Sequence, residues 1–194
     1  IVQTFGFTLA CGGEDFYTGE ATFGYFTRAT LDARAGLDGG EAITPWLRRS
    51  SGMDGSTPSL SYDRMPARLS FLRDVRVVDG GGTYGNGYAH AFLDVLTDAW
   101  FFARHFYEDP VMPGSLGVEA MQSALGTCAY AQIEPSGTVL PRLTTPRDVQ
   151  TRWRYRGQIV PDDLRDGVPL HLEVHVIEQE IDGARVWARG EGSL

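Results

Sequence analysis

One helix in the middle of the chain limits the possible folds more than any other segment. Residues 115–131 read SLGVEAMQSALGTCAYA and follow Pro113-Gly114, and Glu119 is their only charged residue. A helix on a protein surface normally carries a charged face, whereas a helix that is apolar nearly all round is buried on most sides. We therefore expect this helix at the centre of a domain, with other elements packed around it.

Segments with strand character lie before and after the helix. Two precede it, at about 67–78 and 84–95, and three follow it, at about 148–160, 168–178 and 184–190. The last two are joined by Asp182-Gly183, a dipeptide typical of two-residue hairpin turns. Strands that surround one buried helix predict an α+β fold in which an antiparallel sheet wraps around that helix.

The segment at 168–178 alternates between apolar and polar side chains. The apolar set is expected to face the core and the polar set to face solvent. The polar set, His171, Glu173 and His175, could supply metal ligands. No fourth ligand or cysteine cluster accompanies these residues, so we interpret them as a solvated sheet face and expect no metal.

The first third of the chain has the pattern of a smaller unit. Residues 4–28 resemble two strands around Gly12-Gly13, with a short helix expected at 27–36, and segments rich in Gly, Ser and Asp follow. We therefore predict three regions: a partial N-terminal unit at 1–37, a linker at 38–63, and a catalytic domain at 64–194.

The composition excludes several functions. The net charge is −8, and all 17 basic residues are arginine, so general nucleic-acid binding is not expected, and chemistry that requires lysine is excluded. No apolar stretch reaches the length of a membrane span. The two cysteines have no paired spacing and nothing indicates secretion, so we expect a cytoplasmic protein. Neither end reads as a natural terminus, so we expect a piece of a longer polypeptide.

His105 and Glu119 are the candidate catalytic residues. Burying a carboxylate is costly, so Glu119 has either a catalytic role or a structural one, such as capping its own helix. His105 lies within Phe-Phe-Ala-Arg-His-Phe-Tyr, where apolar neighbours favour the neutral imidazole that a general base requires; a core histidine is the alternative. Histidine, Pro-Gly turn, helix N-terminus and carboxylate together supply a base, an oxyanion donor and an acid.

The segment from Trp100 to Gln122, WFFARHFYEDPVMPGSLGVEAMQ, strongly resembles the signature of bacterial 3-hydroxydecanoyl-ACP dehydratases. It looks closest to the dehydratase domains of polyunsaturated fatty acid synthases and related iterative polyketide synthases. The segments 153–158 and 16–26 resemble further parts of the same synthase domains.

The resemblance implies a hot-dog fold, single or double, with residues 1–37 as a partial hot dog. It implies that His105 is the general base, that Glu119 is the general acid, and that the N–H of Gly114 faces the thioester carbonyl. The substrate would be a 3-hydroxyacyl chain on the phosphopantetheine of an acyl carrier protein, dehydrated to a trans-2-enoyl thioester without a further cofactor. The residues expected to line the acyl tunnel are Phe106, Val111, Met112 and Pro113.

Several alternatives stay open. The chain could be a hot-dog thioesterase, or a structural hot dog within a multidomain synthase. In this family the histidine and the acid of one site often come from different hot dogs, so either a homodimer or a pseudo-dimer is expected. Chain length and isomerisation of the double bond depend on tunnel shape. The face shared by Arg152, Arg154 and Arg156 is interpreted as solvated, with contact to an acidic carrier protein as the alternative.

Overall fold

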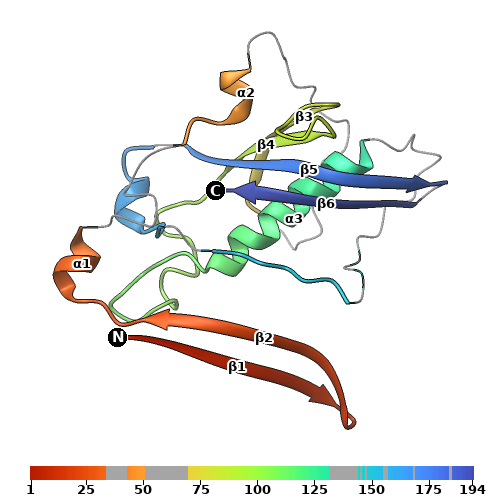
Figure 1. Ribbon diagram of the computed structural model, residues 1–194. Helices are drawn as coiled ribbons and strands as arrows, with labels where there is room; N and C mark the ends of the chain where they lie inside the picture. Colours follow the sequence, from red (N-terminus) through yellow and green to blue (C-terminus); the bar gives the residue numbers. More distant parts are fainter. Residues whose placement is uncertain are drawn as a thin grey trace. The chain divides into compact units, whose positions relative to one another are not determined.

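The computed structural model describes residues 1–33, 43–50, 70–131, 144, 146, 148–154, 157–167, 169–183 and 185–194. The chain divides into two compact units, Ile1–Glu41 and Ala42–Leu194 (Figure 1). The division falls inside the segment 38–63, for which a linker was expected. The central helix and the candidate site residues all belong to the second unit.

The first unit contains an antiparallel hairpin of β1, Val2–Cys11, and β2, Glu14–Gly24. Gly12 and Gly13 form its turn with φ angles of 63° and 86°, which side chains other than glycine rarely adopt. The helix α1, Arg28–Asp32, follows the hairpin. The two strands and the turn predicted from the sequence are therefore confirmed, and α1 is shorter than the range expected for it.

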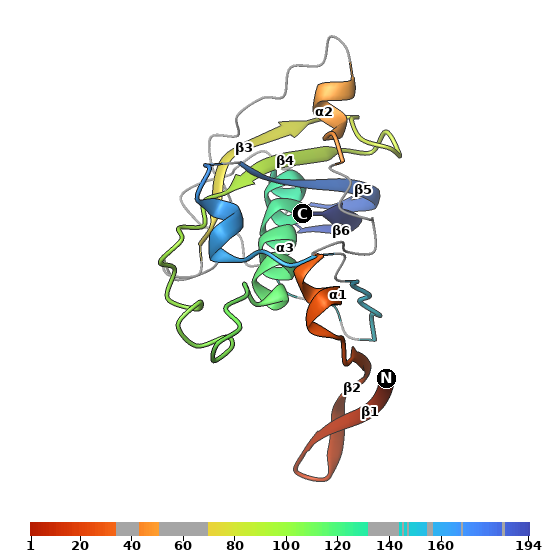
Figure 2. The ribbon, with the colours of Figure 1, turned by 90° about the vertical axis from the view of Figure 1, so that its left-hand side faces the viewer.

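The second unit is a four-stranded antiparallel sheet packed on one long helix. The strand order is β3-β4-β5-β6, and the helix α3, Gly114–Tyr130, lies along one face of the sheet (Figure 2). The strands span Leu72–Val78, Tyr88–Leu93, Leu170–Asp182 and Arg185–Ser193. The unit also contains the short helix α2, Trp46–Arg49, and the 3-10 helix η2, Pro161–Leu164. The predicted α+β architecture and the Asp182-Gly183 hairpin are confirmed.

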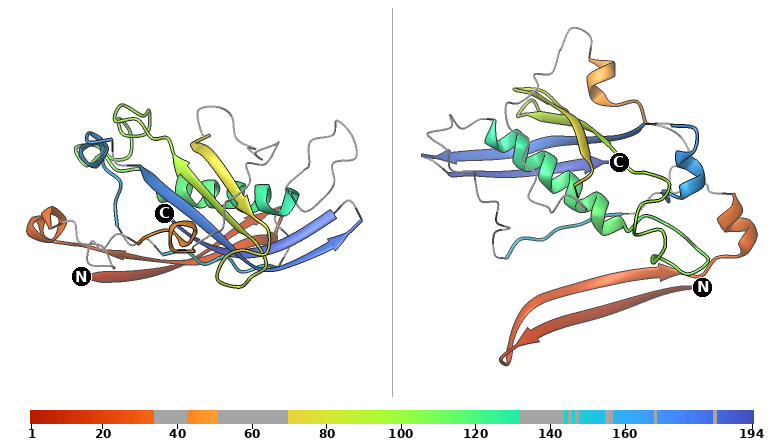
Figure 3. Two further views of the ribbon diagram at one scale, coloured as in Figure 1. Left: turned by 90° about the horizontal axis from the view of Figure 1, so that it is seen from above. Right: turned by 180° about the vertical axis from the view of Figure 1, so that it is seen from behind.

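Small residues on α3 allow the helix and the sheet to approach closely. Gly117, Ala120, Ala124 and Cys128 are buried at helical spacing. The last three form a core with inward side chains of β4 and β5, among them Ala89, Leu172, Val174 and Val176. Side chains spaced three or four residues apart share one face of a helix. The right-hand view of Figure 3 shows α3 running along β5 and β6.

Glycines of β6 also contribute to this close packing. A Cβ atom on Gly190 would lie 2.9 Å from the carbonyl oxygen of His175 and 3.0 Å from Leu125 Cδ1. A Cβ atom on Gly192 would lie 2.9 Å from Met121 Sδ. The helix therefore packs on backbone at these positions, because no side chain larger than hydrogen fits there.

Two expectations about the surface of this unit are wrong. The expected strand at 148–160 is absent among its described residues, 148–154 and 157–160; alternation of side chains does not supply the neighbouring strand that must accept and donate the backbone hydrogen bonds. The polar face of β5 is not fully solvated, because Glu173 and His175 are buried, at 6% and 7% exposure.

Burial of α3 also differs from the expectation. The sheet side of the helix is buried, but the side with Val118, Glu119 and Gln122 is only half-buried in the described part of the chain.

None of the described helices is long and apolar enough to cross a membrane.

Candidate functional site

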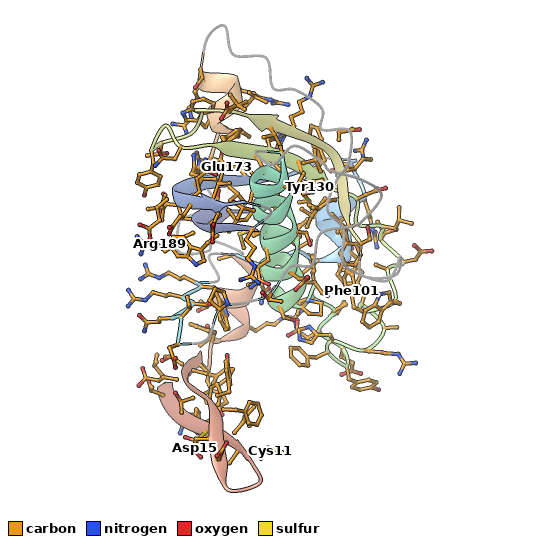
Figure 4. All side chains as sticks on the ribbon, turned by 90° about the vertical axis from the view of Figure 1, so that its right-hand side faces the viewer. Cys11, Asp15, Phe101, Tyr130, Glu173 and Arg189 are labelled. Atoms are coloured by element: carbon orange, nitrogen blue, oxygen red, sulfur yellow. The ribbon has the colours of Figure 1, made fainter. Side chains whose placement is uncertain are left out.

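His105 lies on the loop of residues 94–113, which connects β4 to α3. Phe101 and Phe102 anchor this loop, since both rings are buried in the core. The Phe101 ring packs edge-on against Phe71 before β3, with centroids 5.9 Å apart; Figure 4 labels Phe101. The aromatic run therefore divides, with Phe101 and Phe102 pointing inward and Phe106 and Tyr107 exposed.

Two hydrogen bonds hold His105 against Val111. The His105 ring nitrogen Nδ1 lies 3.0 Å from the Val111 carbonyl oxygen, and the Val111 N–H donates to the His105 carbonyl at 2.8 Å. A carbonyl oxygen can only accept, so Nδ1 carries the proton of this bond. In the neutral imidazole the lone pair is then on Nε2, which is the arrangement that a general base needs.

The neighbouring residue, Phe106, covers one face of the imidazole. The centroids of the two rings are 3.8 Å apart, and the angle between the ring planes is 30°. The His105–Phe106 peptide bond is cis. The backbone of Phe106 exchanges hydrogen bonds with that of Asp109, at 2.8 and 3.2 Å. This tight turn returns the chain to Val111, which explains how residues six apart meet.

The loop ends at the N-terminus of α3. The Met112 N–H donates to the carbonyl of Ile159 at 2.9 Å, Pro113 is the N-cap residue, and Gly114 is the first helical residue. The N–H of Gly114 belongs to the group of first-turn N–H groups that have no acceptor within the helix. These N–H groups and the helix dipole favour negative charge at this end.

Glu119 lies on the second turn of α3. Its side chain is on the half-buried side of the helix, and its Oε1 atom is shielded from solvent. Glu119 is five positions after Gly114, a rise of about 7.5 Å along the helix axis. Glu119 is the only charged residue of α3, as the sequence predicted.

The structure places three of the seven candidate residues in direct contact, His105, Phe106 and Val111. His105 and Phe106 stack on each other, Val111 bonds to His105, and Pro113 and Gly114 follow at the helix start. Met112 is buried in the core at 6% exposure, and Phe106 is 57% exposed. Sequence reasoning gave Val111 a place in the tunnel but missed the role of its carbonyl, because no side-chain pattern reports where a backbone oxygen points.

A second polar cluster lies on the face of the sheet opposite α3. Tyr88, His90, Glu173 and His175 are all buried there. His90 Nε2 lies 2.9 Å from His171 Nδ1. Burial lowers the pKa of His90, with a further contribution from His171, and burial also lowers the pKa of His171, with a contribution from Arg48. The described residues contain no group of three or more side chains suited to hold a metal ion.

Comparison with known proteins identifies the family. Residues 65–193 match the FabA-like domain. Over 97% of its length the chain is also 32% identical to a polyunsaturated fatty acid synthase subunit from Thraustochytrium sp., and it covers 14% of that protein. These matches confirm the resemblance drawn from residues 100–122 and the hot-dog fold that it implies. The chain belongs to the FabA-like domain family.

Proposed function

We propose that this chain dehydrates a 3-hydroxyacyl thioester to a trans-2-enoyl thioester. The observation that carries the proposal is the bond from His105 Nδ1 to the Val111 carbonyl, at 3.0 Å. It leaves the lone pair of the neutral ring on Nε2, on a loop that ends at a helix N-terminus favouring negative charge.

The first step is removal of a proton from the α-carbon. His105 Nε2 takes this proton, and the positive charge of the resulting imidazolium is stabilised through Nδ1 by the Val111 carbonyl. The stacked ring of Phe106 limits rotation of the imidazole during the step. General-base assistance of this kind contributes about 10²–10⁴ in rate.

The electron pair released from the α-carbon then develops as charge on the thioester oxygen. The N–H of Gly114 at the start of α3 is the donor proposed for that oxygen. A backbone donor fixed at a helix N-terminus needs no rearrangement as the charge appears, which makes it effective in lowering the barrier.

The last step is departure of the 3-hydroxyl group. Glu119 in its acid form donates a proton to this oxygen, directly or through a water, as the carbon–oxygen bond breaks. The products are water and the trans-2-enoyl thioester, with the proton on His105 and the negative charge on Glu119. Transfer of a proton back from His105 to Glu119 through solvent restores both groups.

The substrate and setting follow from the family resemblance. The acyl chain is carried on the phosphopantetheine of an acyl carrier protein, and Phe106, Val111, Met112 and Pro113 line the path of the chain. The named relative is part of a synthase, so other synthase domains are proposed as partners, in the cytoplasm. Isomerisation of the new double bond to the 3-position is a further activity to be assayed.

The proposal is tested by incubating the chain with a 3-hydroxyacyl thioester, on a carrier protein or a short pantetheine mimic, and with the corresponding trans-2-enoyl thioester. Interconversion in both directions supports dehydration. Release of the free acid would instead show a thioesterase. A folded chain that leaves both thioesters unchanged would favour the structural role within a synthase.

A second experiment asks whether one site draws residues from two hot dogs. The half-buried side of α3 around Glu119 is compatible with coverage by a second copy. In an isologous dimer, mixing His105→Asn with Glu119→Gln chains restores about a quarter of the native activity, because half of the dimers then hold one intact site. No restoration after exchange of the protomers means that both residues act within one chain.

A further inference from the structure

Glu173 is a buried carboxylate that the proposed reaction does not use. It is 6% exposed, and it lies on the face of β5 that points away from α3, in register with His90 on β4 and Ser193 on β6. A buried carboxylate requires hydrogen-bond donors to compensate for its lost hydration. The parts of the chain that supply these donors are the parts that the carboxylate holds in place.

Two strong donors converge on one oxygen of this carboxylate. The Trp46 N–H donates to Glu173 Oε2 at 2.7 Å, and the Tyr88 hydroxyl donates to the same atom at 2.9 Å. Burial, together with the adjacent Glu173, raises the pKa of Tyr88, so the phenol keeps its proton. Trp46 is distant in sequence, on a segment that precedes the sheet.

The other oxygen faces His175 and Ser193. The Thr83 N–H donates to His175 Nδ1 at 3.0 Å, so the proton of a neutral His175 is on Nε2, which lies 3.7 Å from Glu173 Oε1. The Ser193 hydroxyl lies 3.5 Å from the same oxygen. β4, β5, β6 and the segment of Trp46 therefore all meet at this carboxylate.

Residues 43–50, here called the anchor segment, make further contacts on this face. Pro45 is buried, the Trp46 and Tyr88 rings have centroids 4.8 Å apart, and the Leu47 N–H lies 3.4 Å from the Tyr88 hydroxyl oxygen. Figure 4 labels Glu173 on the sheet, and the left-hand view of Figure 3 shows α2 and α3 on opposite sides of the sheet. The family match begins only at residue 65, so the anchor segment lies outside it.

We propose that the anchor segment is a docked tether, and that Glu173 is the receptor that holds it on the outer face of the sheet. Docking places the beginning of the second unit at about residue 43. Whatever path the intervening residues take, the ten peptide steps from Ala33 to Ile43 reach at most about 36 Å. Without docking, the connection from Ala33 to Leu72 could reach about 140 Å. The anchor thus restricts how far the first unit moves from the catalytic one, independently of the proposed reaction.

Hydrogen exchange of the Trp46 and Leu47 amides in the complete chain tests the docking. These amides are expected to be protected in the native chain, and the Glu173→Gln and Trp46→Ala variants are expected to exchange them at least about tenfold faster. Glu178→Gln, on the exposed part of the same strand, is the matched control and should leave the rates unchanged. Unaltered exchange of the Ala89 and Ala91 amides separates local release from unfolding.

A distance measurement tests the restriction itself. The exposed Cys11 and a second cysteine introduced as Arg185→Cys are spin-labelled, while Cys128 is buried and stays unlabelled. The Glu173→Gln substitution should add longer distances to the measured distribution. Unprotected Trp46 and Leu47 amides in the native chain, or a distance distribution that release does not change, would overturn the proposal.

Discussion

Two hydrogen bonds join His105 to the backbone of Val111: the imidazole Nδ1 donates to the Val111 carbonyl at 3.0 Å, and the Val111 N–H donates to the His105 backbone carbonyl at 2.8 Å. The turn through Pro110 therefore fixes both the position and the tautomer of the proposed base. The ring has two roles, hydrogen-bond donor at Nδ1 and proposed base at Nε2. Different substitutions can test these roles separately.

His105→Asn should retain the donor and remove the base. The asparagine amide can place an N–H near the position of Nδ1, so the bond to Val111 persists. His105→Leu, with similar bulk, loses that bond and should be less stable than His105→Asn by about 1 kcal/mol. Urea unfolding of the two variants measures this difference, and equal stabilities would show that the Val111 bond contributes nothing to the fold.

Gly190→Ala should destabilise the second unit. The new Cβ atom would lie 2.9 Å from the carbonyl oxygen of His175, and a backbone oxygen within a strand pair cannot move aside. The expected loss is about 1–3 kcal/mol in the free energy of unfolding. Gly157→Ala is the control: its Cβ atom meets nothing within 4 Å, so its effect should stay within about 0.5 kcal/mol. Equal effects would contradict the packing of β6 described here.

The two cysteines should differ strongly in reactivity. Cys11 is exposed, whereas Cys128 is fully buried, and burial raises its pKa to about 11. At pH 8 only about one Cys128 thiol in a thousand is ionised. Iodoacetamide followed by mass spectrometry should therefore show one rapid alkylation of the native chain and a second only in denaturant. Rapid modification of both thiols would place Cys128 outside the core.

The free energy of unfolding should decrease in mild acid because the His90–His171 pair takes up protons more readily in the unfolded chain. Burial lowers the pKa of both residues below that of the unfolded chain. As the pH falls below about 6.5, the unfolded chain consequently binds more protons than the folded chain does. The free energy of unfolding therefore decreases. The groups that act on the pair include Arg48, Arg76 and Glu173.

Urea unfolding between about pH 7.5 and pH 5.5 measures this dependence. His171→Asn removes one member of the pair at a half-buried position, so its stability should decrease less over this range than that of the native chain. If the free energy of unfolding depends on pH equally in the two proteins, the two histidines do not change their proton binding on unfolding.

The sequence predicts the elements whose patterns are local. The apolar stretch at 115–131 and the Asp182-Gly183 turn predict α3 and the β5–β6 hairpin to within a few residues, because helix periodicity and turn geometry depend on near neighbours. The prediction of a strand at 148–160 was wrong for a related reason. Its alternation is local, but a strand also requires a partner that local sequence does not provide.

The environment of Glu173 could not be predicted in this way. Its position in an alternating strand indicated a solvated face, whereas Trp46, which donates to it, is 127 residues away in sequence. The same limit applies to His105. The signature indicated the residue and its neighbours, but the Val111 carbonyl that sets its tautomer became visible only in three dimensions.

The most direct test of the proposed function is the rate at which a 3-hydroxyacyl thioester and its trans-2-enoyl product interconvert, for the native chain beside His105→Asn and Glu119→Gln. His171→Asn and Glu178→Gln serve as matched controls, each removing the same residue type from β5, away from the site. We predict that the native chain and both controls interconvert the pair, and that each site variant is folded and slower by about 10²–10⁴. A folded His105→Asn chain with native activity would contradict the assignment of His105 as the base.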